Sequence, residues 1–201
     1  MSKKSLMLLN GSPRKKGTSY RFAETLKKVA EEDGNAATIL HIIDYYDGRE
    51  SLDDLKKAIR KCDVIGLIAP LYADTLPSTV IWFMERLALE LGKDIKGKGF
   101  FSVMQCGYPE IIFCKPAIET SSFFAEETEM NWLGGVAYGL GSLIDGTPIP
   151  ELGRKGKKIA FALKLLLQDI SQGNRISHRV QDLLVSRIPK LVYRPMAMYI
   201  N

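Results

Sequence analysis

The stretch Leu6-Met-Leu-Leu-Asn-Gly-Ser-Pro-Arg-Lys-Lys-Gly-Thr-Ser19 decides the fold. An apolar run ends there in a loop rich in glycine, hydroxyl and basic residues, and the spacing of Phe22, Leu26 and Val29 predicts a helix directly after it. Strand, polar loop and helix in this order are typical of an anion site in an α/β protein, because the first N–H groups of a helix lack partners and carry partial positive charge. The alternative is an ordinary turn with a Ser/Thr helix cap.

The loop offers side-chain donors for an anion from Ser12, Arg14, Thr18 and Ser19. Gly11 and Gly17 permit the backbone to fold tightly around such an anion. A Walker A loop needs four residues between its glycines and then lysine, whereas here five residues separate the glycines and threonine follows. The dinucleotide pattern G-x-G-x-x-G is also absent from this turn.

Strand and helix patterns alternate along the rest of the chain. Apolar segments predict strands at Ser5–Asn10, Ala37–Ile43, Asp63–Ala69, Gly99–Gln105 and Trp132–Tyr138. Helical patterns lie between and after them, at Thr18–Asp33, Ser51–Lys61, Pro77–Leu91, Glu110–Glu127 and Lys157–Gln172. Gly34 and Gly92 are expected just past the ends of two helices. The alternation predicts an α/β fold with a five-stranded parallel sheet covered by helices on both faces.

Composition narrows the class of protein. The chain has 201 residues, the size of one α/β domain, and its three cysteines form no C-x-x-C pair. We therefore expect no metal site and no disulfide framework, and with no membrane-span or signal pattern we expect a cytoplasmic protein. The net charge is +5, and residues 151–201 carry ten basic and three acidic residues. This basic segment is either a solvated face or a site for nucleic acid, anionic lipid or an acidic partner. No nucleic-acid motif accompanies it. We therefore expect neither nucleic acid nor a membrane as a partner.

The segment Asn10-Gly-Ser-Pro-Arg-Lys-Lys-Gly-Thr-Ser19 resembles the phosphate loop G-S-P-R-x-x-[GS]-[NT]-[ST] of the flavodoxin-like NAD(P)H-dependent FMN reductases. The resemblance extends over about residues 5–170 and implies a flavodoxin-like three-layer sandwich with FMN as cofactor and NADH or NADPH as electron donor. It assigns the FMN phosphate to Ser12, Arg14, Gly17, Thr18 and Ser19. Because hydride would pass through N5 of FMN, no catalytic side chain is expected. The iron–sulfur cysteines of some members are absent.

Two further loops follow predicted strands and carry the rest of the resemblance. Ala69-Pro-Leu-Tyr-Ala-Asp-Thr-Leu-Pro-Ser78 looks like the family's P-x-Y-x-x-x-x-P segment, which lines the flavin ring. Gln105-Cys-Gly-Tyr-Pro-Glu110 lies where the family has a glycine-containing loop at the pyrimidine edge of the ring. The resemblance implies flavin contacts from Pro70, Leu71, Tyr72, Ala73, Asp74 and Thr75, and from Gln105, Cys106, Gly107 and Tyr108. Taken alone, the first loop is equally a proline-rich turn. A phosphatase-type nucleophile at Cys106 is excluded because no arginine follows six positions later.

The resemblance implies an FMN-dependent oxidoreductase that passes hydride from NAD(P)H to a small acceptor such as a quinone, nitro compound, flavin or metal chelate. A flavodoxin-type electron carrier and a non-enzymatic flavin-binding sensor are the alternatives. We expect residues 1–174 to form the FMN-binding domain and 142–156 to overhang the ring. Residues 175–201 form an extension with a short helix at His178–Ile188, which packs on the domain, a partner subunit or a membrane; a homodimer is expected.

Overall fold

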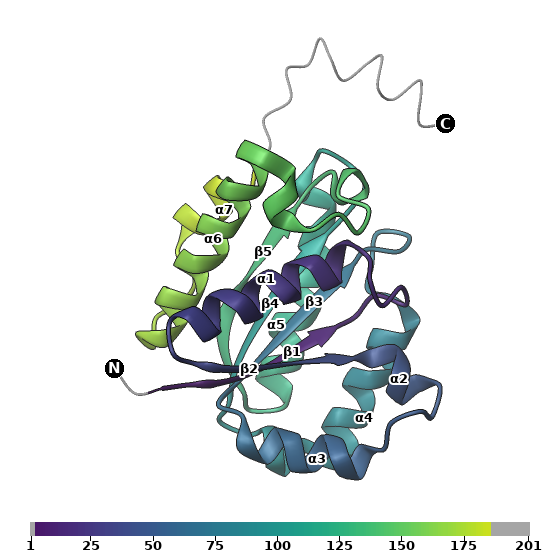
Figure 1. The fold of residues 1–201 in the computed structure, drawn as a ribbon. Coiled ribbons are helices and arrows are strands. Elements are labelled where there is room, and N and C mark those ends of the chain that lie inside the picture. Colours follow the sequence, from purple (N-terminus) through teal and green to yellow (C-terminus); the bar gives the residue numbers. More distant parts are fainter. Residues whose placement is uncertain (1–2, 186–201) are drawn as a thin grey trace.

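The computed structural model describes residues 3–185, and its centre is a five-stranded parallel sheet (Figure 1). The strands are β1 (Ser5–Asn10), β2 (Ala36–His41), β3 (Val64–Pro70), β4 (Gly99–Gln105) and β5 (Asn131–Tyr138), in the order β2-β1-β3-β4-β5. This is the flavodoxin-like order. The chain adds β2 on one side of β1, and then adds β3, β4 and β5 in turn on the other side. The predicted α/β sandwich with five parallel strands is confirmed.

Helices cover both faces of the sheet, which makes three layers (Figure 1). One face carries α1 (Thr18–Glu32), α6 (Gly153–Ser171) and α7 (His178–Leu184). The other carries α2 (Ile42–Tyr46), α3 (Leu52–Lys61), α4 (Ser78–Ile95) and α5 (Lys115–Glu127). Short 3₁₀ turns lie at Ile111–Cys114, Gly141–Leu143 and Ile149–Leu152.

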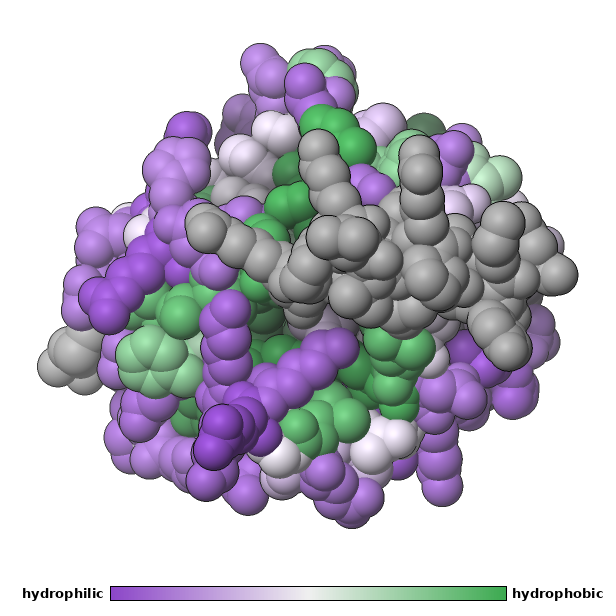
Figure 2. Space-filling view, turned by 90° about the horizontal axis from the view of Figure 1, so that it is seen from above, coloured by the Kyte–Doolittle hydropathy of each residue, from purple (hydrophilic) through white to green (hydrophobic). Residues whose placement is uncertain are grey.

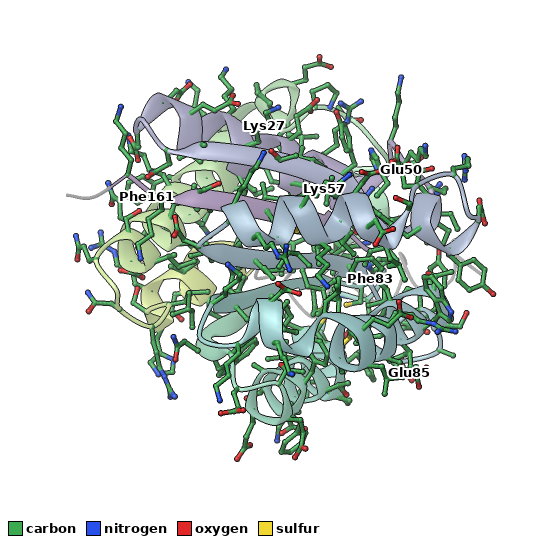
Figure 3. All side chains as sticks on the ribbon, turned by 90° about the horizontal axis from the view of Figure 1, so that it is seen from below. Lys27, Glu50, Lys57, Phe83, Glu85 and Phe161 are labelled. Carbon is green, nitrogen blue, oxygen red and sulfur yellow. The ribbon has the colours of Figure 1, made fainter. Side chains whose placement is uncertain are left out.

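Alternation along the strands produces two separate cores. On β1, Leu6 and Leu8 pack against α1 and α6, while Met7 and Leu9 pack on the opposite side of the sheet. Every residue of β3 is buried, as expected for a central parallel strand. Seen from below (Figure 3), Phe83 of α4 lies in the interior, while Glu85 of the same helix lies at the periphery.

Several predicted boundaries are wrong. The helices predicted to begin at Glu110 and Lys157 begin at Lys115 and Gly153. The strand predicted to end at Ile43 ends at His41, where its neighbour β1 also ends, and Ile42 instead begins α2 and is fully buried. The helix predicted to end before Gly92 continues to Ile95, because Leu91 and Ile95 extend the buried stripe by one more turn.

The chain after α6 covers the exposed edge of β5. The backbone N–H of Ile176 donates to Leu133 O at 2.7 Å, and the amide of Gln181 both accepts from Ala137 N at 2.7 Å and donates to Ala137 O at 2.9 Å. Side-chain and backbone groups thus satisfy an edge that would otherwise be free to pair. The predicted helix His178–Ile188 is α7, ending at Leu184; its last predicted residues and the rest of the tail lie outside the described range. No helix between residues 3 and 185 has the length and hydropathy of a bilayer span.

Candidate functional site at the carboxyl edge of the sheet

The three predicted loops meet at the carboxyl ends of β1, β3 and β4. Ligands of open α/β sheets bind beyond these ends, where the strand order reverses. Viewed from above (Figure 2), hydrophobic residues are exposed between hydrophilic ones. Backbone contacts join the loops: Gly11 N donates to Ile68 O at 2.8 Å, and Leu71 N donates to Gln105 O at 2.9 Å.

Residues 11–17, which we call the phosphate loop, are held by their own hydrogen bonds. Ser12 N donates to Asn10 Oδ1 at 3.2 Å, Arg14 N to Ser12 Oγ at 3.2 Å, and Gly17 N to Arg14 O at 3.2 Å. Gly11 is required by packing, since a Cβ there would lie 2.8 Å from Val80 Cγ2. The loop is therefore ordered by the chain itself.

Several donors of this loop are left over. Among the described residues, none accepts from the backbone N–H groups of Lys15, Lys16, Thr18, Ser19 or Tyr20. The last three begin α1, where the helix dipole adds partial positive charge. The proton of the Ser12 hydroxyl likewise meets no acceptor in the part of the chain that is described, although Ser12 is only 6% exposed. A run of free donors on a turn in which Ser12, Thr18 and Ser19 are buried is suited to an anion.

The other predicted phosphate ligands differ in which of their hydrogen-bond donors remain available for a ligand. The Thr18 hydroxyl donates to Gly141 O at 2.8 Å, so only its backbone N–H is available as a donor. Ser19 Oγ lies 3.5 Å from Gln105 Nε2. Gly17 has φ −77°, and a Cβ there would meet nothing closer than 3.5 Å, so the fold does not require glycine at this position.

Arg14 is exposed and pairs with Asp145 at 3.3 Å. Asp145 belongs to the segment that we expected to overhang the flavin ring. The same segment contacts α1, since Gly146 O accepts from Arg21 Nε, and the adjoining Gly141 O accepts from the Thr18 hydroxyl. This segment therefore closes the phosphate-loop side of the site.

The turn after β3 contains two non-glycine residues with left-handed backbone. Ala73 has φ +48° and Asp74 has φ +61°, and Tyr72 and Thr75 exchange backbone hydrogen bonds of 2.9 and 3.2 Å around them. This is the geometry of a type I′ turn, which normally carries Asn-Gly. Of the four backbone N–H groups of residues 72–75, those of Tyr72 and Thr75 are thus used internally, and those of Ala73 and Asp74 have no acceptor among residues 3–185.

A cavity of about 370 Å³ lies between this turn and the loop after β4. Its lining residues all belong to the predicted flavin contacts: Leu71, Tyr72, Ala73, Asp74, Cys106, Gly107 and Tyr108. Gly107 leaves one wall open, because a Cβ there would meet only Ser142 Oγ at 3.9 Å. Tyr72 and Tyr108 are about half exposed and offer flat apolar faces beside it.

Three predicted contacts do not line this cavity. Pro70 ends β3 and is buried, and Gln105 turns its amide towards Ser19 and Gly141. Thr75 lines a neighbouring open groove of about 530 Å³, between the turn and α4, together with Tyr72, Trp82 and Glu85.

Cys106 is a buried wall residue with a sulfur that contacts Tyr108 O at 3.4 Å. It also lies against the fully buried Cys114: the hydrogen bond between the two thiols, together with burial, raises the pKa of Cys114. This pair packs under the loop, in agreement with a structural cysteine rather than a phosphatase-type nucleophile.

Sequence reasoning missed two residues that hold the phosphate loop in place. Asn10 is completely buried and bonds to the loop at both ends, and His41 bonds to Asn10. Asn10 is the first residue of the phosphate-loop motif, so the sequence offered a reason to assign it a role. The signal for His41 exists only once the register of β1 and β2 is known, since Asn10 and His41 are partners across the sheet.

Comparisons with known proteins agree with this geometry. The sequence profile of the family described as NADPH-dependent FMN reductase matches residues 5–108, which include all three loops as far as Tyr108. No curated protein sequence matches the chain.

Solved structures resemble the fold at low sequence identity. An NAD(P)H:quinone oxidoreductase from Methanothermobacter marburgensis is 11% identical over 84% of this chain and 96% of its own, with a TM-score of 0.63. A flavodoxin WrbA-like protein from Agrobacterium tumefaciens is 15% identical over 77% and 99%, with a TM-score of 0.56. The general stress protein 14 of Treponema denticola, solved in complex with FMN, is 13% identical over 80% and 99%, with a TM-score of 0.55. At these identities the likeness establishes the fold, and the matched profile supplies the family. The chain belongs to the NADPH-dependent FMN reductase family and is an oxidoreductase that uses FMN with NAD(P)H as electron donor.

Proposed function

We propose that this chain binds FMN across the three loops and passes hydride from NAD(P)H to a small acceptor such as a quinone, nitro compound, flavin or metal chelate. The observation that carries the proposal is the run of free N–H groups at Thr18, Ser19 and Tyr20, at the same sheet edge as the cavity beside Ala73 and Gly107. The free N–H groups at the start of α1 are suited to a single phosphate group, and the cavity is suited to a flat ring.

The chain's own residues would bind and orient the cofactor. Ser12 and the start of α1 would hold the phosphate, and Arg14 would leave the exposed Asp145 to join them at small cost, because exposed ion pairs contribute little. The free N–H groups of Ala73 and Asp74 would fix the ring by its polar edge. Bound FMN supplies the hydride-transfer chemistry, so the protein's part is positioning and electrostatics.

The test is to purify the full chain, record its absorbance spectrum and identify by mass spectrometry the small molecule released on denaturation. Oxidation of NADH and of NADPH is then followed with each acceptor class in turn. The proposal expects released FMN and acceptor-dependent turnover, which should be lost in a Ser12→Asp variant. A protein that binds no flavin and oxidises neither nucleotide would contradict it.

We also propose that the chain works as a homodimer in the cytoplasm. Apolar side chains of the loop after β4 and of the 3₁₀ turn that follows it are exposed, including Tyr108 and Ile112, and a second subunit would cover them. Cys62, Cys106 and Cys114 are all free thiols, as in a reducing compartment. Sedimentation at tens of micromolar decides the assembly: a dimer is expected, and a monomer would overturn it. Truncation after Gly173, which removes Asn174 and the extension 175–201, tests the proposed domain boundary in the same experiment.

A further inference from the structure

The buried side chain of Asn10 connects the phosphate loop to His41. Asn10 Oδ1 accepts from Ser12 N at 3.2 Å, while Asn10 Nδ2 lies 3.4 Å from Lys15 O and 3.0 Å from His41 Nδ1. Asn10 is 0% exposed, so water cannot replace any of these partners. One amide group therefore holds the loop at two points and is itself held from β2.

These contacts fix the orientation of the amide and, through it, the state of the histidine. If the Asn10 amide were reversed, its NH₂ would face the N–H of Ser12 and its oxygen would face Lys15 O. The observed orientation leaves Nδ2 as a donor towards His41, so His41 Nδ1 must be an acceptor without a proton. The ring that fits this structure is the neutral imidazole with its proton on Nε2.

The surroundings of His41 favour that neutral form. Burial lowers the pKa of His41, and Lys15 lowers it further, whereas Asp44 acts in the opposite direction. Asp44 is itself paired with Lys15 at 2.7 Å and with Arg49 at 3.2 Å. From α1, the ring of Tyr20 stacks on the imidazole with centroids 5.7 Å apart.

Solvent reaches the ring by a groove of about 440 Å³ between β2 and α1. Its charged side chains are those of Glu24, Lys27, Lys28 and Glu31. Lys27, labelled in Figure 3, is one of them. A proton can therefore reach His41 from the surface while Asn10 stays dry.

We propose that His41 is a positioning residue for the phosphate loop: as a neutral acceptor it holds Asn10, and its protonation releases the loop and weakens the binding of a phosphate group. The inference rests on the proposed function in that FMN is the phosphate ligand. Protonation would place an N–H of His41 against the NH₂ of Asn10, and the amide cannot turn without losing Ser12 N. One buried donor is then left without a partner.

The direction of the pH dependence follows from the lowered pKa. The ordered loop binds a proton at His41 less readily than a free histidine with a pKa of 6.5 does. The loop's stabilisation is therefore complete above pH 6.5 and is lost as the pH falls below it towards the lowered pKa. FMN affinity should fall with it, whereas riboflavin, which lacks the phosphate, should respond little.

Two matched variants of His41 distinguish the role of its acceptor nitrogen from the role of its aromatic ring. His41→Asn keeps an acceptor oxygen near the position of Nδ1 but cannot titrate, and His41→Phe keeps a ring against Tyr20 but has no acceptor. The affinities of FMN and riboflavin are measured by fluorescence between pH 5 and 8. Because the FMN phosphate itself titrates with a pKa of about 6, the wild type is read against His41→Asn, in which only that titration remains.

The loss of one hydrogen bond corresponds to a few-fold to about tenfold in affinity. His41→Phe should bind FMN that much more weakly at every pH, and His41→Asn should match the wild type at pH 8 but lose less affinity at pH 5. Riboflavin should distinguish none of the three. Parallel pH curves for the wild type and His41→Asn, or tighter FMN binding at low pH in the wild type, would overturn the proposal.

Nitrogen NMR of the full chain without added flavin keeps this proposal separate from the cofactor assignment. His41 Nδ1 should be unprotonated at pH 7.5, and its protonation should move the amide signals of Ser12 and Lys15. If those signals move but FMN never binds, the proposed function fails and the link through Asn10 stands. If FMN binds and those signals do not follow His41, the link is wrong.

Discussion

The phosphate loop after β1 and the turn after β3 lie side by side at the carboxyl edge of the sheet, but the chain builds them in different ways. The first contains proline, glycine and hydroxyl residues, and no non-glycine residue in it has a positive φ. The second places Ala73 and Asp74 in the left-handed region, which costs non-glycine residues about 1–2 kcal/mol each. The proposed anion site of the first loop combines hydroxyl and basic side chains with backbone N–H groups at the start of α1, whereas the second loop presents bare backbone N–H groups through its conformation.

The change expected to separate the two loops most strongly is Ser12→Asp. A carboxylate on this buried turn would oppose the phosphate, and like charges in contact cost several kcal/mol. FMN binding should weaken by at least about 100-fold, and riboflavin binding should change little. Titration with both ligands checks this, with circular dichroism as the control for folding. An equal loss for both ligands would mean that the variant acts through misfolding.

Arg14→Ala tests the same loop more gently. Arg14 is exposed, and among residues 3–185 its side chain pairs with Asp145 alone, so removing it should leave the fold intact. FMN should bind more weakly by about 1.5–3 kcal/mol, the contribution of a charge-assisted hydrogen bond. The matched variant Asp145→Asn removes the competing carboxylate and should leave FMN affinity unchanged or slightly higher. If Arg14→Ala affects riboflavin as much as FMN, the arginine does not contact the phosphate.

Gln181→Ala lies outside both loops and should change stability alone. The variant removes both hydrogen bonds to Ala137, which leaves groups of the β5 edge without partners and should cost about 1–3 kcal/mol in the free energy of unfolding. Denaturant unfolding measures the loss. FMN affinity should equal that of the wild type, and a parallel loss of affinity would show that the β5 edge and the site are coupled.

The smallest effect is expected from Ala73→Gly in the turn after β3. Glycine adopts the observed φ of +48° without penalty, so the free energy of unfolding should rise by up to about 1 kcal/mol. The control Ala88→Gly, at an exposed position inside α4, should lower it by about 1 kcal/mol. Two variants of the same chemistry with opposite signs would confirm the strain. A destabilising Ala73→Gly would mean that the turn is not strained.

The phosphate loop and the turn after β3 also differ in how much of them could be predicted from the sequence. The bounds of β1 were predicted correctly because its apolar run ends sharply at Gly11, and every residue that lines the 370 Å³ cavity is one of the predicted flavin contacts. The left-handed turn was not predicted, because Ala73 does not favour a positive φ, and Asp74, a residue type that tolerates it, is not followed by the glycine typical of such a turn. The hydrogen bond of Thr18 to Gly141 and the pairing of Arg14 with Asp145 join residues more than 120 positions apart, and only the packed fold brings them together.

The central claim is that the loop after β1 holds the phosphate of FMN. The most direct measurement is a fluorescence titration of flavin-free full-length protein with FMN, riboflavin and FAD under one set of conditions. We expect FMN to bind at least about 100-fold more tightly than riboflavin, because of several charge-assisted hydrogen bonds to its phosphate, and more tightly than FAD. Riboflavin binding as tightly as FMN would contradict this claim.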